Sequence, residues 1–346
     1  MELKIKVLKV LHGDAIIITF LGNDEKKHNI FIDGGFSSTY ARTIKREAER
    51  IVDRNEKIDI FVITHIDQDH IGGALRFLKE FGKRGIVDEY WVNWCANLDV
   101  SIPDNDWKIS YSQGINLRDY LSDIGKLNVE GFHENLEPIN LYGARITIFS
   151  PEFNDLEYFR KKWSMEEQIL KKELISANQS DYHLSIEELS KKTFVEDTRM
   201  ENKISISFLF EYKDKSILFL ADSHPSTIEN SLKKRCYSKN NKLKVDLIKL
   251  SHHASKFNTN PGLFELVECN SYIISANGRN RHYFPHKETL SRILKNPGRE
   301  NDQKINFIFN YDNAEIRSIF KESDFSLYNF NCFYPAGDEN GYVIEL

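Results

Sequence analysis

Short hydrophobic runs alternate with turn residues along the first third of the chain. Two turn-forming triplets, His12-Gly13-Asp14 and Asp33-Gly34-Gly35, separate these runs, and residues of these types typically end strands. Apolar residues at helical spacing predict helices over 38–55 and 74–81, so we expect a mixed α/β fold. Strands, paired locally and antiparallel at first, are predicted over 4–10, 15–21, 29–33 and 58–64.

The same strand pattern resumes in the second half of the chain. No repeat of fixed period is present, so the two halves resemble each other only loosely and a solenoid is excluded. We expect a single domain over residues 1–346. Further strands are predicted over 204–212, 216–221, 245–250, 271–276 and 305–310.

Residues 152–198 differ in character from the rest, because they are rich in Lys and Glu. Their apolar residues Trp163, Ile169, Leu170 and Leu174 recur at helical spacing, which predicts a helical insertion. Two interpretations remain open. The insertion forms either solvated surface helices with one apolar stripe or a cap over a functional site.

The composition is that of a folded protein. Of 346 residues, 40% are hydrophobic and 29% are charged, which excludes disordered and collagen-like classes. The formal charge of −5 argues against a surface that is basic throughout and binds nucleic acid non-specifically. Four cysteines without Cys-x-x-Cys spacing predict free thiols. With no pattern of a signal peptide or a spanning helix, we expect a cytoplasmic protein without a membrane part.

The residues that follow the strand predicted over 58–64 are rich in metal ligands. Four metal-capable side chains occur within six residues: His65, Asp67, Asp69 and His70. Imidazoles and carboxylates crowded at a strand end are unfavourable unless a cation balances them, whereas a pair of divalent ions needs this mixture of donors. The segment therefore predicts a metal site.

Later segments place further candidates directly after hydrophobic strands. Taken alone, Asp222 fits a helix cap as well as a metal ligand. Seven of the 11 histidines fall in four short segments, which predicts one composite site built from several strand ends. These later candidates are Asp222, His224, His252, His253, His282 and His286. The other four histidines, His12, His28, His133 and His183, are expected to be structural.

On these motifs the chain resembles metallo-β-lactamase-fold hydrolases, and most closely the C-terminal domain of the competence DNA-uptake channel proteins. Residues Thr64 to Gly73 match that domain's Thr/Ser-His-x-Asp-x-Asp-His-Ile-Gly-Gly. The opening Gly13-Asp14-Ala15, the turn Ile32 to Gly35 and the run His252 to Lys256 are further likenesses. The resemblance implies a metallo-β-lactamase-type αβ/βα four-layer sandwich with a helical insertion.

The resemblance also implies two divalent metal ions. His65 and Asp67 would ligate one ion, Asp69 and His70 the other, and Asp222 would bridge them. Because the Asp67 carboxylate replaces the imidazole of ordinary members, Mn²⁺ is as suitable as Zn²⁺.

Further candidates follow from the same resemblance. His252 or His253 matches the late histidine motif. His286 lies near the final motif, although Phe284 stands where the channel proteins have Gly-His-Pro. His133 is a weak candidate for the third-motif histidine. Asp33 and His224 are expected to orient the ligands without binding the ions themselves.

The implied activity is metal-dependent hydrolysis, most simply of a phosphodiester through a hydroxide activated by two metal ions. Asp69 would orient the hydroxide, while His253, His286 or Lys256 would stabilise the transition state or protonate the leaving oxygen. A basic run comes between Asp222 and His252, and more basic residues lie near His286. Such a run is commonly a solvated face, but here it also suits a nucleic-acid backbone. The expected contacts are Lys233, Lys234, Arg235, Arg279, Arg281 and Lys287, and the run extends to Lys239, Lys242 and Lys244.

A nuclease acting in bacterial defence against phage, with a companion protein, would suit a free-standing relative of the channel domain. Two alternatives remain. The chain hydrolyses a small ester, thioester or cyclic nucleotide, since this fold hosts many reactions, or it is a partner subunit that retains metals only for structure.

Overall fold

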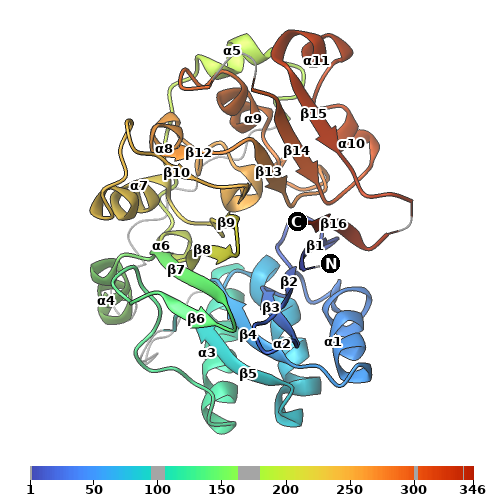
Figure 1. Cartoon of the computed structure of the whole chain (residues 1–346), viewed down its shortest axis with the longest axis vertical. Helices are drawn as coiled ribbons and strands as arrows, with labels where there is room; N and C mark the ends of the chain where they lie inside the picture. Colours follow the sequence, from blue (N-terminus) through green and yellow to red (C-terminus); the bar gives the residue numbers. More distant parts are fainter. Residues whose placement is uncertain (1, 95–105, 163–179, 300–302, 338) are drawn as a thin grey trace.

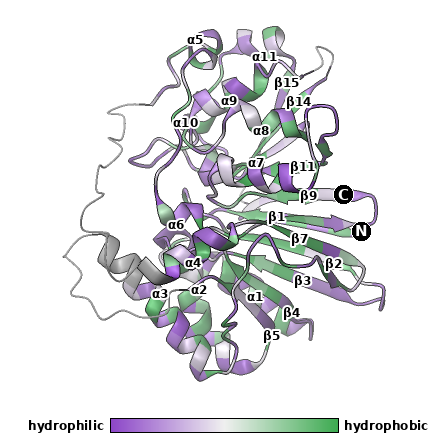
Figure 2. Cartoon of the chain, turned by 90° about the vertical axis from the view of Figure 1, so that its left-hand side faces the viewer, coloured by the Kyte–Doolittle hydropathy of each residue, from purple (hydrophilic) through white to green (hydrophobic). Residues whose placement is uncertain are grey.

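The computed structural model of the chain describes residues 2–94, 106–162, 180–299, 303–337 and 339–346. Its strands form two large sheets that pack face to face between two groups of helices (Figure 1). Most strand residues are hydrophobic, whereas the outer helices alternate between hydrophobic and hydrophilic positions (Figure 2). The order of the layers is therefore helix, sheet, sheet, helix.

The first sheet has six strands in the order β16-β1-β2-β3-β4-β5. Strands β1, β2 and β3 are antiparallel, with Ile18 opposite both Ile5 and Ile30, and β4 and β5 continue the sheet in parallel. Because β16 pairs with β1, the two ends of the chain lie side by side (Figure 1). The strands are β1 (Leu3–Leu8), β2 (Ile16–Leu21), β3 (Lys27–Ile32), β4 (Ile58–Ile63), β5 (Val87–Val92) and β16 (Gly341–Glu345).

The second sheet has eight strands in the order β15-β14-β13-β11-β9-β8-β7-β6. Strands β9, β11, β13, β14 and β15 are parallel, and β6 to β9 are antiparallel. The strands are β6 (Ile139–Leu141), β7 (Ala144–Ser150), β8 (Ser207–Tyr212), β9 (Lys215–Phe219), β11 (Leu247–Lys249), β13 (Ser271–Ile274), β14 (Ile305–Phe309) and β15 (Phe330–Phe333). A separate pair joins β10 (Leu243–Lys244) to β12 (Val267–Glu268).

Alternating side chains of the strands build separate cores on the two faces of each sheet. Ile18 and Phe208 meet in the core between the sheets, whereas Ile17, the neighbour of Ile18, packs with Phe77 under the first helix layer. Both faces of each sheet are thus covered, as continuous hydrophobic strands require. This first layer contains the α-helices α1 (Ile44–Asp53), α2 (Gln68–Phe81) and α3 (Asp106–Asp123). It also contains two short 3-10 helices, η1 (Tyr40–Arg42) and η2 (Gly82–Arg84).

The outer face of the second sheet carries the other helix layer, in which Ile228 and Leu290 pack against strand residues such as Ile248. The predicted αβ/βα four-layer sandwich is therefore confirmed. The remaining helices are α4 (Phe153–Lys162), α5 (Ile186–Ser190), α6 (Met200–Lys203), α7 (Pro225–Lys234), η3 (Ser251–Ala254), α8 (Pro261–Leu266), α9 (Lys287–Leu294), α10 (Ala314–Arg317) and α11 (Glu322–Tyr328).

The insertion predicted over 152–198 contributes α4 and α5, and both helices are anchored to the sandwich. Phe159 of α4 packs on Ile204, and Ile186 of α5 joins the core of the outer helix layer. The stripe formed by Trp163, Ile169, Leu170 and Leu174 lies outside the described residues. A cap formed by that part of the insertion therefore stays a prediction.

Glycines allow the start of α2 to approach the turns after β1 and β3. The Gly34 N–H donates to the His70 carbonyl at 2.8 Å, and the Gly73 N–H donates to the Gly35 carbonyl at 2.7 Å. A Cβ at position 73 would lie 2.0 Å from the carbonyl oxygen of Gly34, and one on Gly13 would lie 2.0 Å from that of Asp69. The backbone contact thus fixes where α2 begins.

We expect Gly73→Ala to lower the free energy of unfolding by at least about 3 kcal/mol, because rigid backbone would have to move apart. Gly85→Ala is the control: no atom lies within 4 Å of the added Cβ, and only the left-handed φ of 66°, which Gly73 in α2 does not share, should cost about 1 kcal/mol. Urea unfolding of both variants measures the difference. Equal costs would show that the contact is not a constraint.

Candidate metal centre

The predicted metal ligands lie at the carboxyl ends of strands from both sheets. His65 and Asp67 follow β4, whereas Asp69 and His70 belong to the first turn of α2. From the second sheet, Asp222 comes just after β9, and His252 and His253 form η3 after β11. Because β9 and β11 are parallel neighbours, their ends bring these side chains together.

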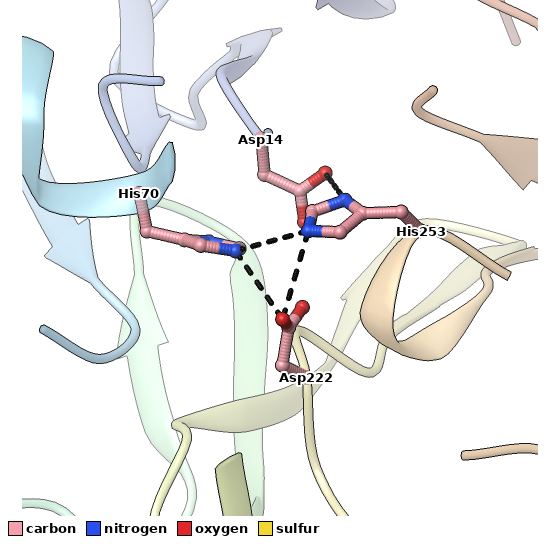
Figure 3. Close-up of side chains that lie close together, drawn as sticks. All are labelled: Asp14, His70, Asp222 and His253. Carbon is pink, nitrogen blue, oxygen red and sulfur yellow. Dashed lines mark hydrogen bonds and ion pairs between the residues drawn. The ribbon is translucent and has the colours of Figure 1, made fainter. Parts of the chain in front are cut away.

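One oxygen of Asp222 lies at the centre of four imidazole rings. Its Oδ2 atom is 3.7 Å from Nε2 of His65, 3.4 Å from that of His70, 3.7 Å from that of His252 and 3.6 Å from that of His253. Figure 3 shows the arrangement for His70 and His253. Separations of this size suit donors that share an ion, because two ligands about 2.1 Å from a tetrahedral ion are about 3.4 Å apart.

One set of donors, the Asp69 site, consists of Asp69, His70, His253 and Asp222. His253 Nε2 lies 3.2 Å from Asp69 Oδ2 and 3.3 Å from His70 Nε2. His70 Nε2 lies 4.0 Å from Asp69 Oδ2. His70 Nε2 and His253 Nε2 thus each lie within 4.0 Å of a carboxylate oxygen of both Asp69 and Asp222.

A second set, the Asp67 site, consists of His65, Asp67, His252 and the shared Asp222. His65 Nε2 lies 3.9 Å from Asp67 Oδ2 and, like His252 Nε2, 3.7 Å from Asp222 Oδ2. The same Asp67 oxygen forms an ion pair with Arg199 Nη2 at 2.8 Å, and the other oxygen, Oδ1, accepts a hydrogen bond from that nitrogen at 3.1 Å. This set is therefore wider than the Asp69 site and already contains a cation.

Residues that follow β3 and β4 orient the imidazole rings of His65 and His70 through their Nδ1 atoms. Asp33 Oδ2 lies 2.8 Å from Nδ1 of His70, and the two Asp33 oxygens also accept from the Thr64 N–H and hydroxyl at 2.8 and 2.7 Å. The Thr64 hydroxyl lies 3.1 Å from Nδ1 of His65. Such contacts turn each Nε2 towards the metal position.

The rings of His252 and His253 also have polar groups beside their Nδ1 atoms. Nδ1 of His252 lies 2.9 Å from Asn258 Oδ1 and 3.4 Å from Asp197 Oδ2. Nδ1 of His253 lies 3.5 Å from Asp14 Oδ1, as Figure 3 shows. All four Nε2 atoms are thereby left to face Asp222.

Buried charges give these groups unusual pKa values. Burial favours the neutral imidazole of His253, but the carboxylates of Asp222 and Asp14 outweigh it and raise the pKa of His253 to about 9. Burial likewise opposes protonation of His70, yet Asp222 and Asp33 raise its pKa. For Asp222, burial alone would raise the pKa, but His70 and His253 lower it well below the usual value.

The residues fit divalent metal ions. His65 Nε2 and Asp222 Oδ1 are buried and have no hydrogen-bond partner among the described residues, although such atoms are normally paired. Asp14, His70, Asp222 and His253 each offer a donor atom within 4.8 Å of the others. The mixture of imidazole and carboxylate donors suits Zn²⁺ or Mn²⁺.

The backbone of η3 is unusual, because His252, His253 and Ala254 have φ values of 46°, 55° and 64°. Residues with side chains rarely adopt this left-handed region. The conformation lets two consecutive histidine rings approach the same carboxylate oxygen.

Sequence reasoning missed the functional place of Asp14. This residue was noted as part of a turn and of the Gly13-Asp14-Ala15 likeness, but its partner Lys249 lies at the end of β11 in the other sheet. Lys249 is 1% exposed, and its ammonium donates to the Asp14 carboxylate. Burial alone would raise the pKa of Asp14, but Lys249 outweighs it and the pKa falls to about 2.

Asp197 and Arg199 were missed as well, since they end a Lys- and Glu-rich segment without a motif. Asp197 Oδ2 accepts from Nδ2 of Asn202 at 2.6 Å and of Asn258 at 3.1 Å. His224, expected behind the ligands, lies with its Nε2 3.9 Å from the same oxygen. His224 therefore lies beside Asp197, which in turn contacts the ligand His252.

The structure does not bring His286 to the metal ligands, which corrects the expectation that it binds metal or acts in catalysis. Its Nδ1 accepts the backbone N–H of Lys256 at 3.2 Å, and its ring packs against Phe257 and Phe284. Burial lowers its pKa well below the usual value. The Phe284 ring instead occupies the space beside His252 and His253, with centroids 5.0 and 5.8 Å away.

The basic run on α7 and after it is used in local contacts. Lys233 pairs with Glu229 at 3.1 Å, and Lys234 pairs with Glu134 at 3.0 Å. Arg235 donates to the carbonyl oxygens of Glu134 and Ile148 at 2.6 and 2.9 Å and lies over the Phe149 ring. Arg235 thus binds the protein's own backbone, Lys233 and Lys234 are half-exposed and ion-paired, and the expected contact of these three residues with substrate stays a prediction.

The remaining basic candidates are Lys287, Arg279 and Arg281, and they differ in burial and in their contacts. Lys287 is fully buried, with its ammonium 3.6 Å from Asp324, so the prediction that it contacts substrate is wrong. Arg279 pairs with Glu315 at 2.7 Å. Arg281 Nε donates to His282 Nε2 at 3.0 Å, and the His282 ring stacks on Phe284. This last contact connects Arg281 to the wall of the site.

We expect Lys249→Met to lower the free energy of unfolding by about 3–5 kcal/mol, because it leaves the Asp14 carboxylate buried without its cation. The double variant Asp14→Asn/Lys249→Met should recover part of the loss. Lys57→Met removes an exposed pair with Asp88 and should cost less than about 1 kcal/mol. If urea unfolding gives Lys249→Met and Lys57→Met the same cost, the buried pair does not stabilise the fold.

Metal binding should release protons, because an ion displaces them from His253 and His70, whose pKa values are raised. Apparent affinity for Zn²⁺ or Mn²⁺ should therefore rise with pH and level off above about 9, where His253 is already neutral. Calorimetric titration in two buffers with different ionisation enthalpies measures the released protons. Affinity that does not change between about pH 6 and pH 9 would contradict the assignment of these ligands.

Comparison with known proteins agrees with this geometry. Residues 9–133 match the family model described as the metallo-beta-lactamase superfamily. The chain is 20% identical over 328 residues to ComE operon protein 3 of Bacillus subtilis (strain 168), which covers 90% of this chain and 33% of that protein. It thus spans about a third of the length of this relative.

Among solved structures, the metallo-beta-lactamase fold protein YhfI from Bacillus subtilis matches with a TM-score of 0.44 and 10% identity over 100% of both chains. A diphosphatase from the PhnP family matches with a TM-score of 0.42 and 12% identity, over 100% of this chain and 98% of its own. Among the described residues, no helix is both long enough and apolar enough to cross a membrane. The resemblance to the metallo-β-lactamase superfamily and to ComE operon protein 3 is therefore confirmed.

Proposed function

We propose that the chain is a metal-dependent hydrolase that cleaves phosphodiesters. The observation that carries the proposal is the convergence of four imidazole Nε2 atoms on one oxygen of Asp222. His65, Asp67 and His252 would hold one ion, Asp69, His70 and His253 the other, and Asp222 would bridge them. Such a pair of ions supplies an activated water at neutral pH and stabilises charge on a phosphoryl oxygen.

The protein's own side chains have separate tasks in this proposal. Asp69 is 18% exposed at its side chain, whereas His70 and His253 are fully buried, so its carboxylate is the ligand that reaches the attacking water. Lys256 follows η3, and its ammonium lies over the Phe257 ring at 5.1 Å. We assign it to charge stabilisation on the substrate.

Nucleic acid is the first substrate to test. Two observations support a phosphodiester: Arg199 is a cation among the ligands of the Asp67 site, and Arg281 adjoins the site through His282 and Phe284. Fixed cations of this kind position phosphates. A nuclease role in phage defence, with a companion protein, extends the proposal through the resemblance to the DNA-uptake channel domain.

We expect metal-stripped protein to hydrolyse bis(p-nitrophenyl) phosphate only after Mn²⁺ or Zn²⁺ is added, with release of nitrophenolate as the measurement. Asp69→Asn should lower turnover at least about 100-fold, because a carboxylate that positions the reacting water is lost. Asp88→Asn is the matched control: Asp88 lies near the start of β5, which runs parallel to β4, and thus at the opposite end of the sheet from the site.

The outcomes separate the alternatives. Turnover that requires metal and Asp69 supports the proposal and leads to a comparison of DNA, RNA and cyclic nucleotides. If both ions bind but no phosphodiester is cleaved, the phosphodiesterase proposal fails. Esters and thioesters then become the substrates to test, and the absence of any turnover would favour a partner subunit that keeps its metals for structure.

A further inference from the structure

The two sets of metal donors differ in what lies beside them. The segment 196–203, which includes the end of the insertion and α6, contacts the Asp67 site through Asp197 and Arg199. The hydrogen bonds and ion pairs found for Asp69, His70 and His253 involve other elements. The two metal positions therefore have different surroundings.

Segment 196–203 is attached firmly to the fold. The Asp197 N–H donates to the Phe257 carbonyl at 3.0 Å, and the Arg199 N–H donates to Asp197 Oδ1 at 3.0 Å. Just beyond the segment, the Ile206 N–H donates to the Thr64 carbonyl at 3.0 Å. Arg199 therefore approaches Asp67 from a fixed backbone.

Arg199 and a metal ion would use the same atom of Asp67. Its Nη2 lies 2.8 Å from Oδ2 and 3.1 Å from Oδ1 of Asp67. Oδ2 is also the oxygen nearest to His65 Nε2, at 3.9 Å, and so is the one that would ligate an ion shared with His65. A guanidinium and a divalent ion on one oxygen repel each other, and burial reduces the screening of that repulsion.

We propose that Arg199 lowers the metal affinity of the Asp67 site and makes the two sites fill in order, the Asp69 site first. The inference rests on the two metal sites of the proposed function. An ion occupies the Asp67 site only when it shares the Asp67 carboxylate with the Arg199 guanidinium or displaces the guanidinium from it.

Calorimetric titration of metal-stripped protein with Mn²⁺ tests the proposal. The unaltered chain should show two binding steps whose affinities differ by at least about tenfold. Arg199→Gln should tighten the weaker step by about tenfold and affect the tighter step much less. Arg199→Lys keeps a cation beside Asp67 and should stay close to the original protein. Arg50→Gln removes an exposed arginine of α1 that pairs with Glu47 and should change neither step.

Three results would overturn the proposal. The first is a single affinity for both ions in the unaltered chain. The second is a weaker binding step whose affinity falls in Arg199→Gln, and the third is a weaker binding step whose affinity does not change in that variant. The first needs no variant, so the proposal stays testable even if Arg199→Gln fails to fold. Metal titration does not depend on turnover. Ordered binding without phosphodiester cleavage would leave this inference intact and refute only the proposed activity.

Discussion

The negative charge on Asp222 Oδ2 is the interaction on which the site depends. Four imidazole nitrogens lie 3.4–3.7 Å from this oxygen, and the far nitrogen of each ring is held by another group. Without a cation, protons on His70 and His253 must balance the buried carboxylates, which is why their pKa values are raised. The buried carboxylates and imidazoles around Asp222 therefore form a set of donors whose negative charge is best balanced by metal ions.

Both sheets contribute to this arrangement. Ligands from β4 and α2 meet ligands that follow β9 and β11, and the Asp14–Lys249 pair crosses the same boundary. The close contact of Gly34 with Gly73 fixes the start of α2, and so the positions of Asp69 and His70. Packing between the sheets and the geometry of the metal centre are thus parts of one structure.

The sequence was sufficient for the features that are local. Hydrophobic runs identified the strands, and polar residues after β4, β9 and β11 identified most of the ligands. Contacts between distant segments were not accessible. Nothing near Lys249 in the sequence indicates that Asp14 is its partner, and nothing in the insertion indicates that Arg199 reaches Asp67. Some partners of the basic run were hidden for the same reason, since Glu134, which pairs with Lys234, is a hundred residues away.

The left-handed backbone of η3 has a consequence for how the site responds to damage. In an extended strand, neighbouring side chains point to opposite faces, so His252 and His253 can serve two adjacent ions only while three consecutive residues keep positive φ values. Each such residue carries about 1–2 kcal/mol of strain. That strain favours relaxation of the whole turn whenever either ring loses its partner. The two histidines are therefore a mechanical unit, so a substitution at either position also disturbs the backbone that positions its neighbour.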